Sequence, residues 1–145
     1  NMWSRRWVGA RDYVWLINQD CTPQLMQMNL DVGAGGQLTY MPPGGLSQSP
    51  YGSLFGRPVI EIEQCSTVGD VGDIILASFS EYQMIEKGGV QSASSIHVRF
   101  IFDETVFRFV YRCDGTPKWS LPLTPYQTAA TALTQGPFVA LAARA

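Results

Sequence analysis

The alternation of aromatic and charged side chains in the second half of the chain constrains the fold more than any other feature. Phe107, Phe109 and Tyr111 alternate with Arg108 and Arg112. A repeat of two residues places the aromatic side chains on one face of an extended strand and the arginines on the opposite face. We therefore expect a strand over 106–112.

Other segments share this strand-type composition, being rich in β-branched and aromatic residues. The expected strands are 13–17, 57–63, 74–77, 82–87, 96–102, 106–112 and 138–142. One face of the strand over 96–102 is expected to carry four apolar side chains, those of Ile96, Val98, Phe100 and Phe102. A chain with this many short strands is mainly β.

Two glycine-containing pairs predict turns between these strands. Gly88-Gly89 indicates that the chain reverses there, so that the segment from Val90 onward pairs with 82–87 as a hairpin. Asp114-Gly115 is likewise typical of a turn.

Helical signals are confined to the first thirty residues. Trp3 and Trp7 lie four residues apart, which predicts a short amphipathic helical turn or the end of a longer helix. Thr22 is the expected N-cap of a second helix, with Pro23 at its first position, that runs to Leu30. The order of helix, strand, short helix, long loop and many strands predicts an α+β fold.

Charged residues are scarce, and this bears on what covers the folded chain. They make up 15% of the sequence, against about 25% in typical soluble domains. Hydrophobic residues make up 46% and aromatic residues 12%. We therefore expect much of the outer surface to be buried against partners. The alternative is a monomer whose polar cover consists of Ser, Thr, Gln and Gly. The net charge of -2 argues against nucleic-acid binding through bulk positive charge.

The longest irregular segment, Val32–Gly56, contains no charged residue but seven glycines and three prolines. A connection of this length inside a compact domain is usually functional or mobile. Its run Gly33–Gly36 lacks the spacing of a phosphate-binding loop and the Lys-Ser/Thr that would follow. A nucleotide site is therefore not expected.

Metal and thiol chemistry find little support. Cys21, Cys65 and Cys113 share no metal-ligand spacing, so free thiols in a reducing cytoplasm are expected and a zinc site is not. His97, the single histidine, falls at a strand position where a solvent-facing or hydrogen-bonded role is expected. The sequence has no apolar run of eighteen residues that would cross a membrane.

Paired carboxylates are the strongest hint of catalysis. Glu61 and Glu63 are expected on one face of the same strand, about 7 Å apart along it. That spacing suits an acid/base pair, but any half-buried strand shows the same pattern. Asp70 and Asp73 lie among glycines, where Asp serves turn geometry. We therefore expect no catalytic residue, no cofactor and no metal.

Taken in order, four motifs resemble the tailed-bacteriophage major capsid protein family, which has the Hong Kong 97-like fold. They are Tyr13–Asn18 followed by Pro23 and Leu25, Leu54–Ile60 followed by Glu63-Gln64, Gly72-Asp73 followed by Tyr82, and Phe107-Arg108 followed by Tyr111–Gly115. Each is weak alone, but together they cover roughly residues 13 to 115 in the order that the family has.

The resemblance implies a domain organisation and a place within a longer protein. Residues 1–12 would end the spine helix of the peripheral domain, and 13–81 would form the axial domain. Residues 82–120 would be strands of the peripheral domain, and 121–145 would return to the axial domain. The chain would be the C-terminal portion of a capsid protein, which agrees with its start at Asn1 rather than at an initiator Met.

The resemblance also implies a function. The chain would be a structural head protein, not an enzyme, that assembles with copies of itself into pentamers and hexamers of an icosahedral shell. The shell would enclose phage DNA without reading its sequence, and portal, scaffold or decoration proteins are further expected partners. The location would be the virion capsid, assembled in the host cytoplasm. Some relatives cross-link subunits through Lys and Asn, but no Asn follows Asn29 here, so that acceptor is missing.

Contacts between subunits are then expected at two groups of residues. The loop Val32–Gly56 would carry contacts around an axis, and the other group would form ion pairs between subunits. The loop candidates are Tyr40, Met41 and Leu46, and the ion-pair candidates are Glu61, Glu63, Arg108 and Arg112.

Three other interpretations stay open on sequence alone. One is an encapsulin-type nanocompartment shell, which shares the fold but encloses an enzyme. Another is a monomeric β-rich module that binds a protein or glycan through exposed aromatic residues. The third is a hydrolase that uses Glu61 and Glu63.

Overall fold

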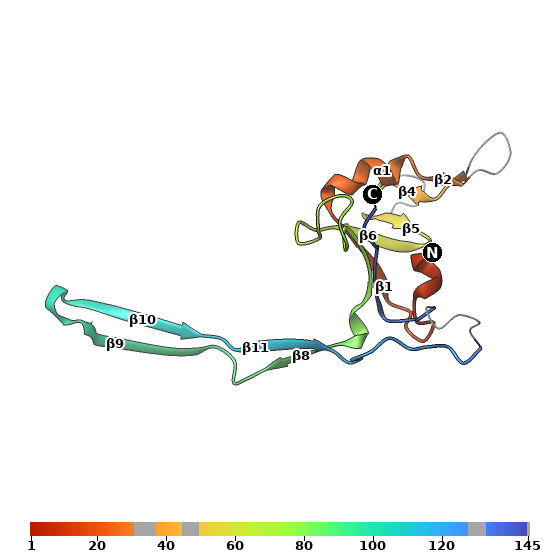
Figure 1. The fold of residues 1–145 in the computed structure, drawn as a ribbon. Coiled ribbons are helices and arrows are strands. Elements are labelled where there is room, and N and C mark those ends of the chain that lie inside the picture. Colours follow the sequence, from red (N-terminus) through yellow and green to blue (C-terminus); the bar gives the residue numbers. More distant parts are fainter. Residues whose placement is uncertain (31–36, 45–49, 128–132, 145) are drawn as a thin grey trace. The chain divides into compact units, whose positions relative to one another are not determined.

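The computed structural model describes residues 1–30, 37–44, 50–127 and 133–144. The chain divides into two compact units (Figure 1). We call Asn1–Glu81 together with Trp119–Ala145 the sheet unit, and Tyr82–Lys118 the ribbon unit. Each is described by itself.

A six-stranded sheet forms the centre of the sheet unit, in the order β12-β7-β1-β6-β5-β4. Its strands are β1 (Tyr13–Ile17), β4 (Tyr40–Met41), β5 (Gly52–Leu54), β6 (Arg57–Glu61), β7 (Ile74–Ser78) and β12 (Phe138–Ala140). β1 pairs in parallel with β6 and antiparallel with β7. The sequence predicts β1, β6, β7 and β12 because their residues are β-branched and aromatic.

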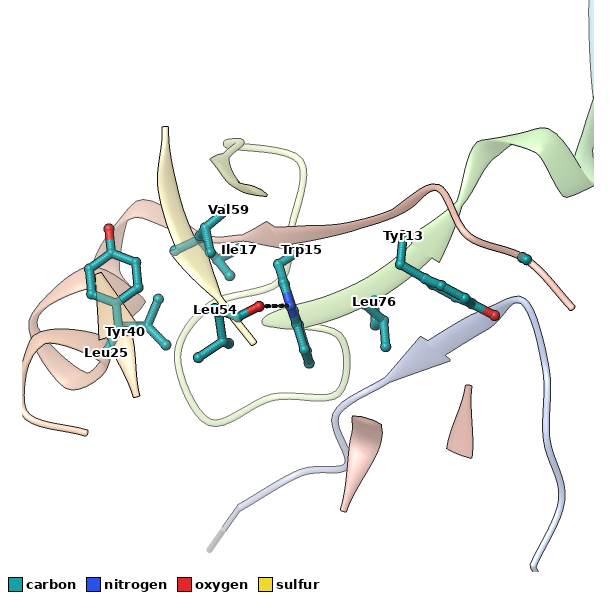
Figure 2. Packing of buried hydrophobic residues seen from close by; sticks show 9 residues of the cluster. Tyr13, Trp15, Ile17, Leu25, Tyr40, Leu54, Val59 and Leu76 are labelled. Carbon is teal, nitrogen blue, oxygen red and sulfur yellow. Dashed lines mark hydrogen bonds between the residues drawn. The ribbon is translucent and has the colours of Figure 1, made fainter. Parts of the chain in front are cut away.

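The core of the sheet unit lies on one face of this sheet (Figure 2). Tyr13, Trp15 and Ile17 alternate along β1 and are all buried. The indole Nε1 of Trp15 donates a buried hydrogen bond to the backbone oxygen of Leu54 at 3.0 Å, which ties β1 to β5. Leu25 adds a buried side chain from α1 (Thr22–Met26).

The helices are shorter than predicted. The first is a 3-10 helix over Met2–Arg5, and α1 ends at Met26 rather than at Leu30. The predicted cap was wrong, because the N-cap position is Cys21 and the hydroxyl of Thr22 donates instead to Glu61.

After α1 the chain becomes extended. Asn29–Leu30 forms β2, which pairs with β3 (Gln37–Leu38). The two strands form a separate two-stranded sheet. The segment that was expected to continue the helix is therefore part of a strand pair.

The ribbon unit is a single long hairpin made of two strand pairs (Figure 1). Its strands are β8 (Tyr82–Glu86), β9 (Gln91–Arg99), β10 (Glu104–Val110) and β11 (Cys113–Pro117). β9 pairs with β10, and β8 pairs with β11, both antiparallel.

This pairing contradicts the hairpin predicted at Gly88-Gly89. Both glycines have positive φ, +74° and +62°, but they form an irregular step in the outgoing arm rather than a reversal. The amide of Lys87 still donates to Arg112 in the returning arm at 3.0 Å. The segment from Val90 onward therefore pairs with β10 and not with β8.

Two further expectations about this unit were wrong. Asp114-Gly115 lies inside β11, where Asp114 pairs with Ile85, and forms no turn. The predicted strand over 96–102 ends at Arg99, because Phe100–Phe102 forms a 3-10 turn at the hairpin tip. Phe100 and Phe102 therefore do not share a strand face with Ile96.

The α+β fold class is confirmed: the chain is mostly β-strand, with one short α-helix among the described residues.

Candidate functional site

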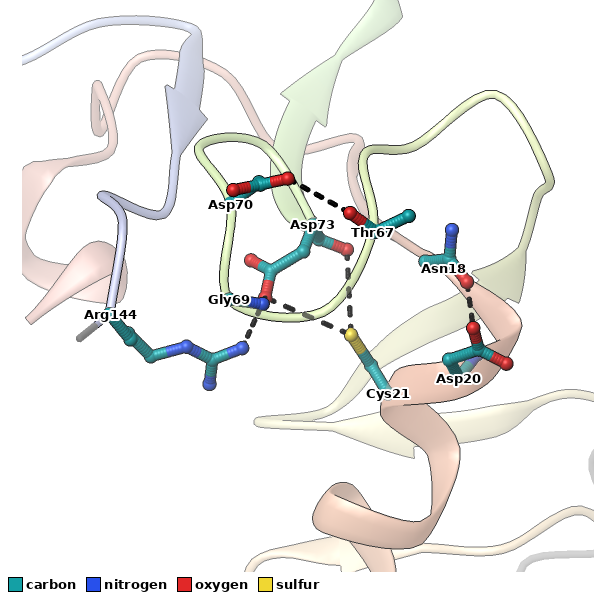
Figure 3. A network of polar contacts seen from close by, with 8 residues as sticks. All are labelled: Asn18, Asp20, Cys21, Thr67, Gly69, Asp70, Asp73 and Arg144. Atoms are coloured by element: carbon teal, nitrogen blue, oxygen red, sulfur yellow. Dashed lines mark hydrogen bonds and ion pairs between the residues drawn. The ribbon is translucent and has the colours of Figure 1, made fainter.

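The most polar cluster of the sheet unit surrounds Asp73 (Figure 3). Its carboxylate is fully buried, and Oδ2 accepts from the amide of Gly69 at 3.1 Å and pairs with Arg144. The thiol of Cys21 lies 3.9 Å from the same oxygen. Among the described residues, Oδ1 of Asp73 has no hydrogen-bond partner.

Within the sheet unit, this cluster holds the C-terminal segment against residues 69–73. The amide of Gly72 donates to Leu141 at 3.1 Å, and the amide of Arg144 donates to Gly69 at 2.8 Å. Burial raises the pKa of the Cys21 thiol, which disfavours the reactive thiolate. In the described part of the chain, no group of three or more His, Cys, Asp or Glu side chains could hold a metal ion. A structural role explains these contacts.

Asp12 forms a second polar clamp, which the sequence did not reveal. The hydroxyl of Ser78 donates to Asp12 Oδ1 at 2.5 Å, and the amide of Ser80 donates to Oδ2 at 2.9 Å. The Ser78 hydrogen bond is the largest cause that lowers the pKa of Asp12 to about 2. The clamp joins the residue before β1 to the end of β7.

An apolar cavity of about 590 Å³ also belongs to the sheet unit. Trp3, Trp15 and Leu54 are among its lining residues, and its charged members are Arg5 and Arg144. Among the described residues, no carboxylate and no histidine lines it. The described lining therefore lacks the groups that acid/base chemistry requires.

The three loop residues predicted to contact other subunits differ in whether their side chains are exposed. Tyr40 is 4% exposed and lies in the core, where its ring covers Gly52 so closely that a Cβ there would be 2.2 Å from the hydroxyl. It is a core residue of the sheet unit rather than an exposed contact. Met41 is exposed. Leu46 lies outside the described residues.

The two glutamates do not form a pair on one strand. Glu61 is the last residue of β6, and Glu63 lies beyond its end. Glu61 accepts a hydrogen bond from Thr22 at 2.8 Å. Both side chains are exposed.

Two of the three arginines of the ribbon unit, Arg108 and Arg112, lie on one of its faces, as the alternation predicts. Arg108 and Arg112 are exposed and line a shallow cavity of about 300 Å³ together with Gln91, Ala93 and Val110. Register pairs Arg108 with Ala93 and Val110 with Gln91, which places these side chains together. We call this the arginine face.

The opposite face of the ribbon is apolar. Register pairs Phe107 with Ser94 and Phe109 with Ser92, and directly opposed residues share a face. Ile96 follows Ser94 two residues further along β9.

The same face continues into the other strand pair. The hydroxyl of Tyr111 donates to Glu86, and this hydrogen bond raises the pKa of the tyrosine. Met84 pairs with Gly115, and the ring of Tyr82 lies against Gly115. We call the following set the apolar face: Tyr82, Met84, Ile96, Phe107, Phe109 and Tyr111.

The ribbon unit differs from the sheet unit in having no core. Every residue of 82–118 is described, and none is buried. All six residues of the apolar face are exposed. A two-stranded ribbon offers two faces and has no third strand or helix of its own to cover either. Both faces of the ribbon are therefore exposed, and its residues form no convergent catalytic group.

Comparison with protein families gives one result. A family model described as the phage capsid family matches residues 5–127. No curated protein and no solved structure matched the chain. None of the described helices combines the length and the apolar character that a membrane crossing needs.

Proposed function

The chain belongs to the phage capsid family, and on that premise we propose that it self-assembles into the icosahedral shell of a phage head. The match covers residues of both the sheet unit and the ribbon unit. The chain is thus a structural capsid protein, and the proposal concerns how it assembles.

The ribbon unit carries this proposal, because residues 82–118 include no buried side chain. An isolated two-stranded hairpin is marginally stable in water at best. This one also exposes the six large side chains of the apolar face. Exposed apolar surface of this extent marks a site of interaction.

The free energy gained by burying the apolar face can exceed the free-energy cost of association. Burying one large apolar side chain contributes about 1.5–3 kcal/mol, so the apolar face could supply roughly 9–18 kcal/mol as an upper bound. Association costs about 4–15 kcal/mol in lost freedom. A closed shell in which each subunit has several neighbours multiplies such contacts.

Individual residues have proposed roles in this assembly. Arg108 and Arg112 would form ion pairs with carboxylates of a neighbouring subunit, among which Glu63 is exposed. Glu61 is a weaker candidate because Thr22 already donates to it. Met41 would contribute an axial contact.

The units have proposed places in the subunit as well. Residues 13–81 would form the axial domain, and 82–120 the strands of the peripheral domain. Residues 1–12 would end the spine helix, and 121–145 would return to the axial domain. These assignments rest on the family and on the division of the chain near 81 and 118.

The wider setting is part of the proposal. Pentamers and hexamers of this subunit would enclose packaged DNA in the virion, assembled in the host cytoplasm, with portal, scaffold or decoration proteins as partners. We propose no catalytic role.

Light scattering after size-exclusion chromatography tests self-assembly. The chain should form assemblies far larger than its 16.0 kDa monomer as concentration rises. Replacing both Phe107 and Phe109 with Ser should weaken assembly, because the apolar face loses both of its phenylalanine rings. Val71→Ser is the matched control, since Val71 is exposed in the sheet unit. A chain that stays monomeric at every concentration and salt condition would contradict the proposal.

A further inference from the structure

The apolar cavity of the sheet unit has the size and lining of a site for a small ligand. Its volume is about 590 Å³, and ligand pockets span roughly 300–1,000 Å³. Several separated stretches of the chain line it, with Trp3, Trp15, Phe55 and Leu141 among the lining residues. Such pockets combine a mainly apolar lining with a few polar groups that orient the ligand, and this cavity has that composition.

Three aromatic rings among the lining residues stack on one another. The ring centroid of Trp3 lies 6.2 Å from that of Trp15 and 5.7 Å from that of Phe55, with an interplanar angle of 22° in both pairs. The guanidinium carbon of Arg6 lies 4.0 Å from the Trp3 ring centroid, and its Nη1 donates to the backbone oxygen of Trp3 at 2.6 Å. These contacts hold the rings in place, so they present a preorganised surface to a flat apolar group.

Phe55 reaches this cluster from a backbone conformation that phenylalanine rarely adopts. Its φ is +51° and that of Gly56 is +70°, in the two-residue connection between β5 and β6. Connections of this kind favour Asn-Gly, and a bulky side chain in the left-handed region costs free energy. The side chain of Phe55 is also 48% exposed, so burial does not offset that cost in full. A half-exposed ring at a strained position indicates a functional role for the ring.

The charged side chains in the described lining are two arginines, Arg5 and Arg144. Arg144 pairs with Asp73. Among the described residues, the side chain of Arg5 has no ion-pair or hydrogen-bond partner. A cavity whose charged side chains are all cationic attracts anions. A guanidinium group also matches the geometry of a carboxylate, which it binds through two parallel N–H donors.

We propose that this cavity binds a small aromatic anion, with its flat ring against the aromatic cluster and its carboxylate or sulfonate on Arg5. A neutral apolar molecule would leave the guanidinium of Arg5 without a partner, and a cation would be repelled by both arginines. The described lining offers no acid/base group, so the cavity binds the anion without converting it. The inference goes beyond assembly and does not depend on it.

Isothermal titration calorimetry of the full chain with naphthoate tests the site. Naphthoate carries a flat apolar ring system and one carboxylate, and for a ligand of that size we expect a Kd on the order of 0.1 mM. Naphthamide has nearly the same shape but no charge. It should bind roughly tenfold more weakly than naphthoate, because it forms no charge-assisted hydrogen bond with Arg5.

Two pairs of variants locate the binding. Arg5→Gln should raise the Kd of naphthoate roughly tenfold and leave that of naphthamide unchanged, because only the anion uses the guanidinium. Its control is Arg57→Gln, at a partly buried arginine outside the cavity. Ala142→Phe adds a ring to the lining and should weaken the binding of both ligands. Its control is Ala143→Phe, at the neighbouring exposed residue, which does not line the cavity.

Weaker naphthoate binding in Arg5→Gln and Ala142→Phe, with both controls unchanged and the circular dichroism spectrum of the parent chain retained, would support the site. A parent chain that does not bind naphthoate, or that binds naphthamide equally well, would overturn it. Equal losses in Arg5→Gln and Arg57→Gln would also overturn it, because they would show attraction by overall charge. If Arg5→Gln does not fold, the comparison of the two ligands and the alanine pair decide. None of these results bears on self-assembly, which is measured separately.

Discussion

At the scale of single residues, two carboxylates stabilise the sheet unit through different environments. The carboxylate of Asp73 is fully buried and forms an ion pair with Arg144, whose side chain is partly exposed. Asp12 is exposed but accepts hydrogen bonds from two serines. The first residue matters for how the C-terminal segment is held, and the second for how stability responds to pH.

Arg144→Met should destabilise the sheet unit by about 3 kcal/mol, because breaking a buried pair leaves an uncompensated charge. The double variant Asp73→Asn with Arg144→Met should recover much of this loss, since it also removes the buried charge. Urea unfolding measures both, with Arg11→Met as the control for an exposed arginine. An Arg144→Met variant as stable as Arg11→Met would contradict the role assigned to the ion pair.

Asp12→Asn should change how stability depends on acid pH. The folded pKa of Asp12, about 2, lies below its ordinary value of 3.8. The group therefore contributes stability that is fully present above pH 3.8 and is lost as pH falls toward 2. Because Asp12 is exposed, we expect no more than about 1 kcal/mol.

The measurement is the unfolding free energy of the chain at pH 5 and at pH 2.5. The difference between the two pH values should be smaller in Asp12→Asn than in the parent chain. Glu63→Gln, at an exposed carboxylate, is the control. Identical pH dependence of the unfolding free energy in all three proteins would refute the stabilising role assigned to the hydrogen bonds of Asp12.

At the scale of elements, the ribbon depends on a close contact between β8 and β11. A Cβ on Gly115 would lie 2.5 Å from the hydroxyl of Tyr82, so the ring must move to admit it. Gly115→Ala should therefore destabilise this strand pair by about 1–2 kcal/mol.

Hydrogen exchange of the amides in β8 and β11 measures the effect of Gly115→Ala. Exchange should accelerate in β8 and β11. Adding Tyr82→Ala to Gly115→Ala should remove the clash, but it should not restore the contact between the tyrosine ring and residue 115. Exchange in β1 of the sheet unit serves as the internal reference. Unchanged protection in β8 and β11 would show that the ring is not held against Gly115.

Local patterns in the sequence predicted strands well but their partners poorly. The sequence predicted β1 and β7 correctly, because a short run of β-branched and aromatic residues of that length is typical of a buried strand. Gly88-Gly89 was misread because positive φ serves both a tight turn and an irregular step within a strand arm. The choice between them depends on pairing between β8 and β11, more than twenty residues apart.

The candidate site was predictable to a similar degree. Alternation correctly separated Arg108 and Arg112 from the aromatic side chains, because the period of a strand is local information. The burial of Tyr40 was not predictable, since it depends on Gly52 in a neighbouring strand. The tip residues were assigned to a strand because Phe and Ile favour strands. Asp103-Glu104 indicated an interruption, but the turn already begins at Phe100.

At the scale of the whole molecule, the two units differ in how much buried core stabilises them. The sheet unit has a core of aromatic and aliphatic side chains. The ribbon unit has none, since no residue of 82–118 is buried, and under the proposed function neighbouring subunits would cover it. Membership of the phage capsid family gives this imbalance a physical reason, because a subunit of a shell leaves its assembly surfaces exposed until its neighbours cover them.

Negative-stain electron microscopy of the purified chain, across a range of concentration and salt, tests the central claim most directly. We expect closed shells, or rings of five or six subunits. A uniform field of small monomers under every condition would contradict self-assembly as the function of this chain.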